Sequence, residues 1–577
     1  MNPVIKSQTR TFQKESGLEE LSQSEAFEAY TIFSVISGQL SYGVDPLQVH
    51  LKGDEFGLDG VGILIQGKLA ADTDEASALL DDVVDPDVEF LFFQSKTGTS
   101  YDYGDIGKMF DGIDQFFNDE LLGESDQLDD LMAVKELIFE KAVTRRNPAL
   151  RVYYATTGTY SHPDKIENLL DRRMRTLREQ SIFDTSRMHL DMLGAEKLQN
   201  YYRSAKRSSR AKIEFPRQTA LPKNPRVEQG YVGYIDANEL LKLVEVRGEG
   251  GEIVGINRFA FFDNIRDFNE KSPLNKSVGE TLRSGEGSDF VFRNNGVTVI
   301  AKSIHRTADE FIVEDYQIVN GCQTTNILFQ NRDHISDVSI PFRLIGSDDD
   351  DFISSIIVGT NSQNQVKPEQ FLALLPFVKN LEEFSRSADE AYRVYIERRE
   401  YQYQHENIER ARIMPLAVLM KAVSATILKQ PNRSPRDYKK LFKDNSSLLF
   451  SDVSDVQLYH AIAYLYYRLE FLWRNNRIDA SLKIFRFYII WAAFREATGN
   501  ENFLKPLKAA KYAMYSEKII EFSKDEDAFK KAVERYAAAF NKATKELSTE
   551  NREKLRDSIR SETFFMKVSD ELFTPDD

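Results

Sequence analysis

Two stretches near the N-terminus carry residue types that could hydrolyse a phosphodiester. The stretch DEFGLDGVGILIQGK at 54–68 holds Asp59 between two glycines, and VEFLFFQSKTG at 88–98 holds Gln94 and Lys96. This reaction needs an ordered divalent cation, an activated water and a positive charge that stabilises the transition state. Asp59 and Gln94 offer oxygen ligands for the cation, and Lys96 can orient the water or stabilise the pentavalent phosphate.

These residues are predicted to lie on neighbouring strands. Apolar runs at Val61–Ile65, Val88–Gln94 and Arg151–Ala155 predict three strands. Side chains alternate between the two faces of a strand. Along the second strand, one face carries Phe90, Phe92, Gln94 and Lys96, and the other carries Leu91, Phe93 and Ser95. Gln94 and Lys96 therefore point the same way, beyond a phenylalanine-rich stretch that anchors the strand.

A preceding helix supplies a further carboxylate. The stretch SEAFEAYTIFSVI predicts a helix with Ser24 as its N-cap. On it Glu28 shares the apolar stripe of Ile32 and Val35, where a charge is costly unless it is paired or metal-bound. Glu25 is an alternative to Glu28.

Alternatives remain open at the second carboxylate as well. Asp54 and Glu55 compete with Asp59. An Asp beside Gly is also ordinary turn chemistry, and a Gln and a Lys two residues apart are common at a strand end.

The order of a helix glutamate, a strand aspartate and a strand Gln-x-Lys pair resembles the PD-(D/E)xK nucleases, in the form found in Mrr-type restriction enzymes. The resemblance implies that Asp59, Gln94, Lys96 and Glu28 are catalytic, and that Asp59, Gln94 and Glu28 bind Mg²⁺ or Mn²⁺. Two features depart from the family pattern. Gln94 replaces the usual acid, and the acidic segment from Asp72 to Asp87, expected as a surface excursion, lengthens the connection between the two strands.

Composition limits the other possibilities. A chain of 577 residues is too long for one core. A single cysteine excludes an internal disulfide and a thiolate zinc cluster, so a metal site must use mainly oxygen ligands. No apolar run reaches about 18 residues, so a soluble, cytoplasmic protein without membrane contact is expected. The P-loop, GxSxG and HExxH motifs are absent from the sequence.

The charge distribution bears on nucleic-acid binding. The net charge of −16 argues against indiscriminate adhesion to nucleic acids, because phosphate binding relies on Lys and Arg. Basic residues nevertheless concentrate from Arg172 to Arg178 and from Arg203 to Arg226. This distribution fits an enzyme that touches nucleic acid transiently, although each stretch is also typical of a solvated helix face.

The pattern along the chain predicts an α/β multidomain protein. We expect a restriction-endonuclease-like α/β domain at 1–160, a basic helical connector at 161–232, an α+β domain at 233–370 and an all-helical region at 371–577. The aromatic-rich helices of the last region could form a homodimer surface, but such aromatics are more often core.

Five ordered motifs in the second half are more distinctive. They are FFDNIRDF, NKSVGETL, FRNNGVTVIA, YQIVNGCQTTNIL and TNSQNQVKPEQF. Together they resemble the abortive infection phage resistance (AIPR) family, from about Tyr231 to past Pro431. The resemblance implies a role in bacterial defence, with a phage-derived molecule as a candidate trigger.

Two Asn- and Gly-containing junctions in this region could hold a phosphate. They are Asn294-Asn295-Gly296 and Asn320-Gly321-Cys322-Gln323-Thr324, where side-chain and backbone amides are available. A similarity to DGQHR-type proteins and to the ParB-like fold implies that Arg266, Gln323 and Thr324 face a nucleotide or the DNA backbone. The alternative is that the asparagines satisfy buried turns. Cys322 is expected to be a small core residue.

The sequence thus predicts a metal-dependent endonuclease of anti-phage defence, with DNA favoured over RNA as substrate and the central domain as a sensing or regulatory module. The alternative is a defence protein that binds DNA or a nucleotide without cutting.

Overall fold

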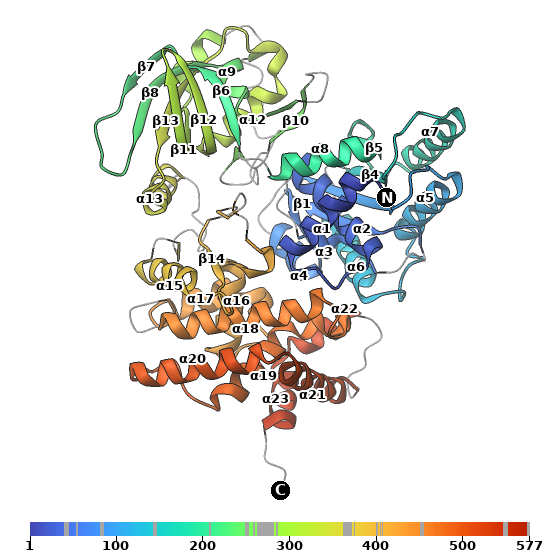
Figure 1. Ribbon diagram of the computed structural model, residues 1–577, viewed down its shortest axis with the longest axis vertical. Coiled ribbons are helices and arrows are strands. Elements are labelled where there is room, and N and C mark those ends of the chain that lie inside the picture. The colour runs from blue at the N-terminus through green and yellow to red at the C-terminus, as the bar shows by residue number, and fades with distance from the viewer. Residues whose placement is uncertain are drawn as a thin grey trace.

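The structure is a computed structural model of the whole chain. It describes residues 1–39, 45–52, 56–80, 86–141, 147–206, 209–247, 253–257, 260–261, 282–283, 287–361, 372–373, 375–399, 402–403, 406, 408–450, 455–545 and 552–573. Figure 1 shows three domains: an N-terminal domain, a central domain built on a sheet, and a C-terminal domain of helices. The N-terminal domain contacts the helical domain directly, although the central domain separates the two in the sequence.

The N-terminal domain alternates helices and strands up to residue 206. Its elements are α1 (Pro3–Ser16), α2 (Gln23–Phe33), the π-helix η1 (Ser34–Gln39), α3 (Pro46–Val49), β1 (Gly60–Ile65), β2 (Lys68–Leu69), α4 (Thr73–Leu80), β3 (Val88–Lys96), α5 (Tyr103–Phe117), α6 (Asp126–Lys141), β4 (Ala149–Thr156), α7 (Asp164–Glu179), η2 (Thr185–Arg187), β5 (Met188–Leu193) and α8 (Ala195–Lys206).

These strands form one five-stranded sheet between two layers of helices. The strand order is β2-β1-β3-β4-β5, with β1 antiparallel to β2 and β3, and with β3, β4 and β5 parallel. Phe90 and Phe92 pack into the core beneath α5, α6 and α7, whereas Leu91 and Phe93 pack into the core beneath α1, α2 and α8. The predicted alternation along β3 is therefore confirmed.

Helix α2 begins earlier than predicted. Its N-cap is Ser22, whose backbone amide donates to Glu25 Oε2 at 2.9 Å while the Glu25 amide donates to Ser22 Oγ at 3.3 Å. This reciprocal capping box satisfies two amides that the helix leaves free. The prediction of Ser24 as the N-cap is wrong, because the box places the cap two residues before it.

The central domain is built on a six-stranded sheet in the order β6-β12-β11-β13-β8-β7. Its elements are β6 (Arg210–Glu214), β7 (Arg217–Ala220), β8 (Gln229–Asp236), α9 (Ala237–Leu241), β9 (Glu245–Arg247), β10 (Ile253–Ile256), η4 (Gly287–Asp289), α11 (Phe290–Arg293), β11 (Val297–Thr307), β12 (Glu310–Asn320), α12 (Cys322–Gln330), η5 (Arg332–His334), β13 (Ser339–Gly346) and α13 (Asp350–Asn361). Strands β11 and β12 form a long antiparallel pair, and β11 runs parallel to β13 at the centre of the sheet.

The C-terminal domain is helical apart from a two-stranded pair. Its elements are α15 (Pro376–Ser387), β14 (Tyr395–Glu397), η6 (Arg410–Arg412), β15 (Ile413–Pro415), α16 (Leu416–Thr426), α17 (Ser434–Asp444), α18 (Val456–Arg474), η7 (Ala480–Phe485), α19 (Arg486–Thr498), α20 (Ala509–Lys524), α21 (Glu526–Lys545), α22 (Arg552–Ile559) and α23 (Glu562–Phe573). Most aromatics of α18 and α19 are buried in one core. Of the helices in the described ranges, none is both long and apolar enough to cross a bilayer.

The stretch expected as a basic connector is divided between two sheets. Helix α7, strand β5 and helix α8 complete the N-terminal domain, and β6, β7 and β8 are strands of the central sheet. In β6, exposed Arg210 and Lys212 form ion pairs with Glu314 and Glu310 of β12. The charges that suggested a solvated helix therefore pair across a sheet.

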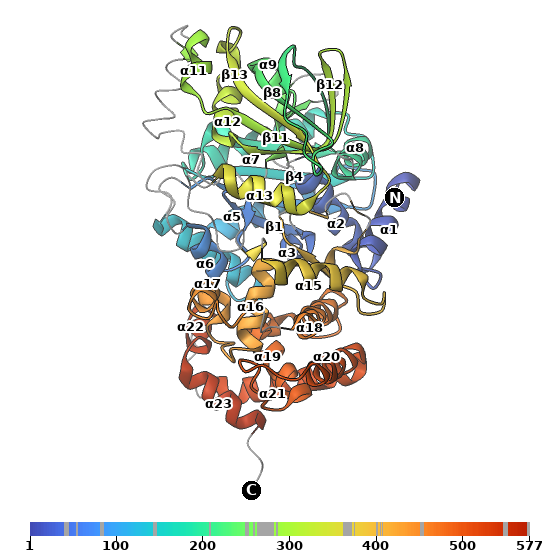
Figure 2. The same cartoon turned by 90° about the vertical axis from the view of Figure 1, so that its left-hand side faces the viewer.

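The acidic segment after β2 is an interface and not a free surface excursion. It forms α4, which packs against α6, and two of its aspartates bind arginines in and directly after the C-terminal helix α22. Arg556, whose side chain is 9% exposed, lies 2.9 Å from Asp72 and 2.6 Å from Asp130 of α6, and Arg560 binds Asp74. Figure 2 shows the N-terminal domain lying above the α17 and α22 end of the helical domain.

The ion pairs of Arg556 with Asp72 and Asp130 predict a measurable loss of stability for Arg556→Ala. Removing one partner of a buried ion pair leaves the other charges uncompensated, and the partial exposure of both aspartates reduces the penalty to about 2 kcal/mol. We expect a lower midpoint of thermal unfolding. Arg535→Ala is the matched control, because Arg535 binds Glu496 with its side chain 59% exposed. Equal midpoints for the two variants would contradict the role of Arg556.

Candidate active site

Asp59 and Gln94 lie opposite each other at the start of β1 and near the end of β3. The antiparallel register pairs Gly60 with Phe93, and the Asp59 amide donates to the Phe93 carbonyl at 2.8 Å. Gln94 Nε2 lies 3.2 Å from each carboxylate oxygen of Asp59, and the Ser95 amide also donates to this carboxylate. Two of the predicted site residues are thus in direct contact.

Close packing of α5 fixes the backbone that leads into Asp59. Gly57 has φ of +67°, and a Cβ atom there would lie 2.7 Å from the carbonyl carbon of Lys108 in α5. On the facing helix, a Cβ at Gly112 would lie 2.2 Å from the Phe56 carbonyl oxygen. Glycine is required at both positions because the loop and the helix touch backbone to backbone. This contact fixes the path of the backbone that leads into Asp59, and the bonds from Gln94 Nε2 and the Ser95 amide orient its carboxylate.

The Gln94 side chain has a buried oxygen atom that is available to bind a metal ion. Gln94 is fully buried, and its Oε1 atom has no hydrogen-bond partner in the described part of the chain. A buried acceptor without a partner is costly, so such an atom in a native protein indicates a missing water or ion. With the Asp59 carboxylate beside it, the pair offers hard oxygen donors that suit Mg²⁺ or Mn²⁺. The residues present therefore fit a divalent cation.

Lys96 and Tyr154 lie beside this pair. Lys96 is the last residue of β3 and is half-buried, in register with Thr156 of β4. Tyr154 is the register partner of Gln94 and is fully buried. Burial raises the pKa of the Tyr154 hydroxyl, and the negative charges of nearby Asp105, Asp102 and Asp59 raise it further. The hydroxyl therefore stays protonated and can act as a donor.

Glu28 is held by a histidine. Its carboxylate lies 2.7 Å from His50 Nε2 and accepts a hydrogen bond from Ser24 Oγ at 3.0 Å. The His50 backbone forms a bridge with Gly60, the residue after Asp59. Glu28 is thus bound to Ser24 and His50, and its helix α2 packs on the Leu91 and Phe93 face of the sheet, opposite the face of Gln94. Among the residues that are described, no cluster of three or more His, Cys, Asp or Glu side chains is arranged around a metal position.

The three alternative carboxylates have different outcomes. Glu25 is used by the capping box of α2: burial acts to raise its pKa, but the hydrogen bonds with Ser22 lower it below the ordinary value. Its role is therefore structural. Asp54 and Glu55 lie outside the described residues.

In the central domain, the structure brings together Asn294 and Thr324. Asn294 Nδ2 donates to Thr324 Oγ1 at 3.0 Å, and Asn294 Oδ1 accepts from the Gly296 amide at 2.8 Å. Asn320 Nδ2 donates to the Thr360 carbonyl at 3.1 Å. Both asparagines are thus used in the hydrogen bonds of the fold itself, as the structural alternative expects.

The remaining candidates of this region are more exposed. Asn295 and Gln323 are exposed, and Arg266 lies outside the described residues. Helix α12 begins at Gly321, which has φ of 88° and provides no side-chain cap. Cys322 packs against the core of the central domain, as predicted.

Two residues of the N-terminal site were missed in the sequence. Tyr154 could have been found from the predicted strand at 151–155, because parallel pairing with the Gln94 strand places it beside the amide. His50 could not, since its contact with Glu28 depends on the path of the segment 45–52 along β1.

Comparison with known proteins finds one family match, in the second half of the chain. Residues 261–548 match the family model described as AIPR protein, which covers the larger part of the central domain, including β11, β12 and β13, and most of the helical domain. No curated protein and no solved structure matches the chain.

The orphaned Gln94 oxygen predicts that a divalent cation stabilises the protein. Saturating Mg²⁺ or Mn²⁺ should raise the midpoint of thermal unfolding, because a ligand that binds only the folded state shifts the equilibrium toward it. Asp59→Asn should abolish this shift. Asn keeps the shape of the side chain and an acceptor for the Ser95 amide, so the metal-free variant should remain folded. An unchanged shift in Asp59→Asn would exclude this site.

Proposed function

We propose that this chain, whose residues 261–548 form an AIPR domain, is a metal-dependent endonuclease whose catalytic site lies in the N-terminal domain. The proposal is supported chiefly by one observation. The Asp59 carboxylate and the orphaned Gln94 Oε1 are in contact at a strand end, with Lys96 two residues further along the same strand.

The topology of the N-terminal domain supports the same proposal. A helix with Glu28 precedes an antiparallel pair with Asp59 and Gln94, and a helical crossover then leads to the parallel strand β4. This order is similar to that expected from the PD-(D/E)xK resemblance. Helix α4 comes between these two strands in the chain but not in space, because β1 and β3 pair directly with each other.

Each side chain has a role in phosphodiester hydrolysis. Asp59 and Gln94 would hold the cation, which would polarise the phosphate and lower the pKa of a water molecule. Lys96 offsets the negative charge that develops on the phosphate in the transition state. The His50 contact holds Glu28 in position beside β1. Asp59 is the charged ligand of this pair, and Gln94 is a neutral amide. The affinity for a metal ion is therefore expected to be low until a substrate phosphate adds its own oxygens.

The AIPR domain supports a role in abortive infection, in which the cutting activity serves anti-phage defence. We propose nucleic acid as the substrate and the central domain as the regulatory module. The low metal affinity of a Gln-x-Lys site suits an enzyme that stays inactive until substrate is bound.

Lys96→Ala is expected to reduce cleavage of plasmid DNA or RNA roughly 100-fold or more in the presence of Mg²⁺, because it removes the cation that stabilises the transition state. Gel electrophoresis of the products measures this. Lys141→Ala, at the exposed end of α6, is the control and should cut at the parental rate.

Parental activity in Lys96→Ala would overturn the assignment of this residue. Retained binding without any product from the parental protein, in both Mg²⁺ and Mn²⁺, would instead favour the non-cutting DNA- or nucleotide-binding protein.

A further inference from the structure

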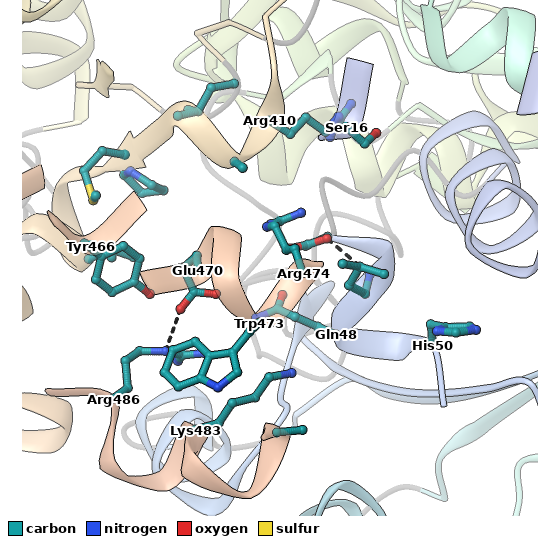
Figure 3. A pocket seen from close by; sticks show the side chains of 18 of the residues that line it. Ser16, Gln48, His50, Arg410, Tyr466, Glu470, Trp473, Arg474, Lys483 and Arg486 are labelled. Carbon is teal, nitrogen blue, oxygen red and sulfur yellow. Dashed lines mark hydrogen bonds and ion pairs between the residues drawn. The ribbon is translucent and has the colours of Figure 1, made fainter. Parts of the chain in front are cut away.

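A cavity of about 640 Å³ lies between the N-terminal domain and the helical domain. This volume is in the range of small-molecule sites in proteins. One part of its wall, here called the cavity floor, is formed by residues 45–52 of the N-terminal domain and by residues 470–487 of the helical domain. Figure 3 shows Lys483, Arg486, Trp473 and Arg474 from the helical domain gathered near Gln48 from the N-terminal domain.

The cavity floor carries a lysine from each domain. Lys52 donates to Asn476 Oδ1 across the domain boundary. The Lys483 ammonium has no hydrogen bond or ion pair within the described ranges. Burial lowers the pKa of Lys483, and the positive charges of Arg486 and Lys52 lower it further, whereas the carboxylates of Glu470 and Asp45 act to raise it. Its side chain lines the cavity and is open to it, although protein surrounds it.

The carboxylates of the cavity floor already have partners. Asp45 binds Arg474, and Glu470 Oε1 lies 2.8 Å from Arg486 Nε. Asp479 accepts from the Ser481 amide at 2.9 Å, which caps η7. The floor residues that line the cavity include four cations, Lys52, Arg474, Lys483 and Arg486, and three carboxylates, Asp45, Glu470 and Asp479. Glu25 also faces Lys52 from outside the floor, so Lys483 is the floor cation left without a paired carboxylate in the described ranges.

Acidic groups elsewhere in the wall do not reverse this local balance. Asp72 binds Arg556 of α22, Asp74 binds Arg560 directly after this helix, and Glu15 binds Lys206. Burial and the neighbouring Asp72 charge raise the pKa of Glu75, which favours its neutral form. Asp126, Glu397 and Glu406 also line the cavity, and Glu406 binds Arg386. An anion would therefore bind most favourably at the floor, where Lys483 has no paired carboxylate in the part of the chain that is described.

We infer that this cavity binds a phosphorylated small molecule of nucleotide size, with its phosphates between Lys52 and Lys483. A dianionic or more highly charged group would neutralise both lysines and connect the two domains. The walls also contain apolar surface for an organic portion, including Phe33 and Trp473.

The cavity floor leads directly to the candidate active site. Lys52 follows Leu51, whose amide donates to the Asp59 carbonyl at 2.9 Å, and His50 on the same segment binds Glu28. A ligand at Lys52 therefore acts on the segment that holds two of the proposed catalytic residues. The binding itself is independent of the proposed cleavage, because it can be measured without divalent metal and without nucleic acid.

Thermal unfolding and calorimetry of the full chain, in EDTA, test this inference with ATP and inorganic pyrophosphate as probes. We expect ATP to raise the unfolding midpoint of the parental protein. Lys483→Met and Lys52→Met should each lose most of the shift and bind ATP at least 10-fold more weakly. Lys531→Met, an exposed lysine on α21, should behave as the parent does. Lys483→Met should also unfold at the parental temperature or above without ligand, since it removes a charge that has no paired carboxylate in the described ranges.

The two probes distinguish the source of the phosphate. A larger shift with ATP than with pyrophosphate supports a nucleotide, and equal shifts support an inorganic polyphosphate. The inference is overturned if neither probe shifts the parental midpoint, or if both Lys→Met variants of the cavity bind ATP as tightly as the parent. Cleavage activity is not a readout here, so this failure is separable from failure of the proposed nuclease function.

Discussion

The antiparallel pairing of β1 with β3 is the constraint on which the candidate site depends. It sets Asp59 opposite Gln94, and the backbone bond from Asp59 to Phe93 closes the ladder at the point where the side chains meet. A shift of one residue would turn Gln94 to the opposite face of the sheet. The register is secured by Phe90 and Phe92 on one side and by Leu91 and Phe93 on the other, because each pair is buried in its own core.

Much of the N-terminal domain could be predicted from hydrophobic periodicity. The strands at 61–65, 88–94 and 151–155 and the helices after them are present within a few residues, because buried alternation leaves a strong pattern. Charged strands were missed. In β6 the sequence RAKIE alternates between exposed and buried, but its basic residues suggested a helix face until the acidic partners on β12 were known.

The site was only partly predictable for a related reason. Asp59, Gln94 and Lys96 are local in the chain or lie on adjacent strands, so motif order brings them together. The contact of Glu28 with His50, and that of Asp74 with Arg560, join segments whose approach is decided by packing. In the central domain, Asn294 and Asn320 have amide groups that suit either a ligand or a turn. Their bonds to Thr324 and to the Thr360 carbonyl show the turn role, which residue type alone does not reveal.

Helix α4 connects the N-terminal sheet to the C-terminal helix α22. In the chain it follows the β1–β2 hairpin and precedes β3, the strands at which Asp59 and Gln94 of the candidate site lie. Arg556 of α22 binds Asp72, directly before α4, and Arg560 binds Asp74 within it. A displacement of α22 would therefore act on α4 and, through the β1–β2 hairpin that precedes it, on the Asp59 side of the candidate site. The acidic segment that lengthens the connection between β1 and β3 thus also joins the N-terminal sheet to the C-terminal helices.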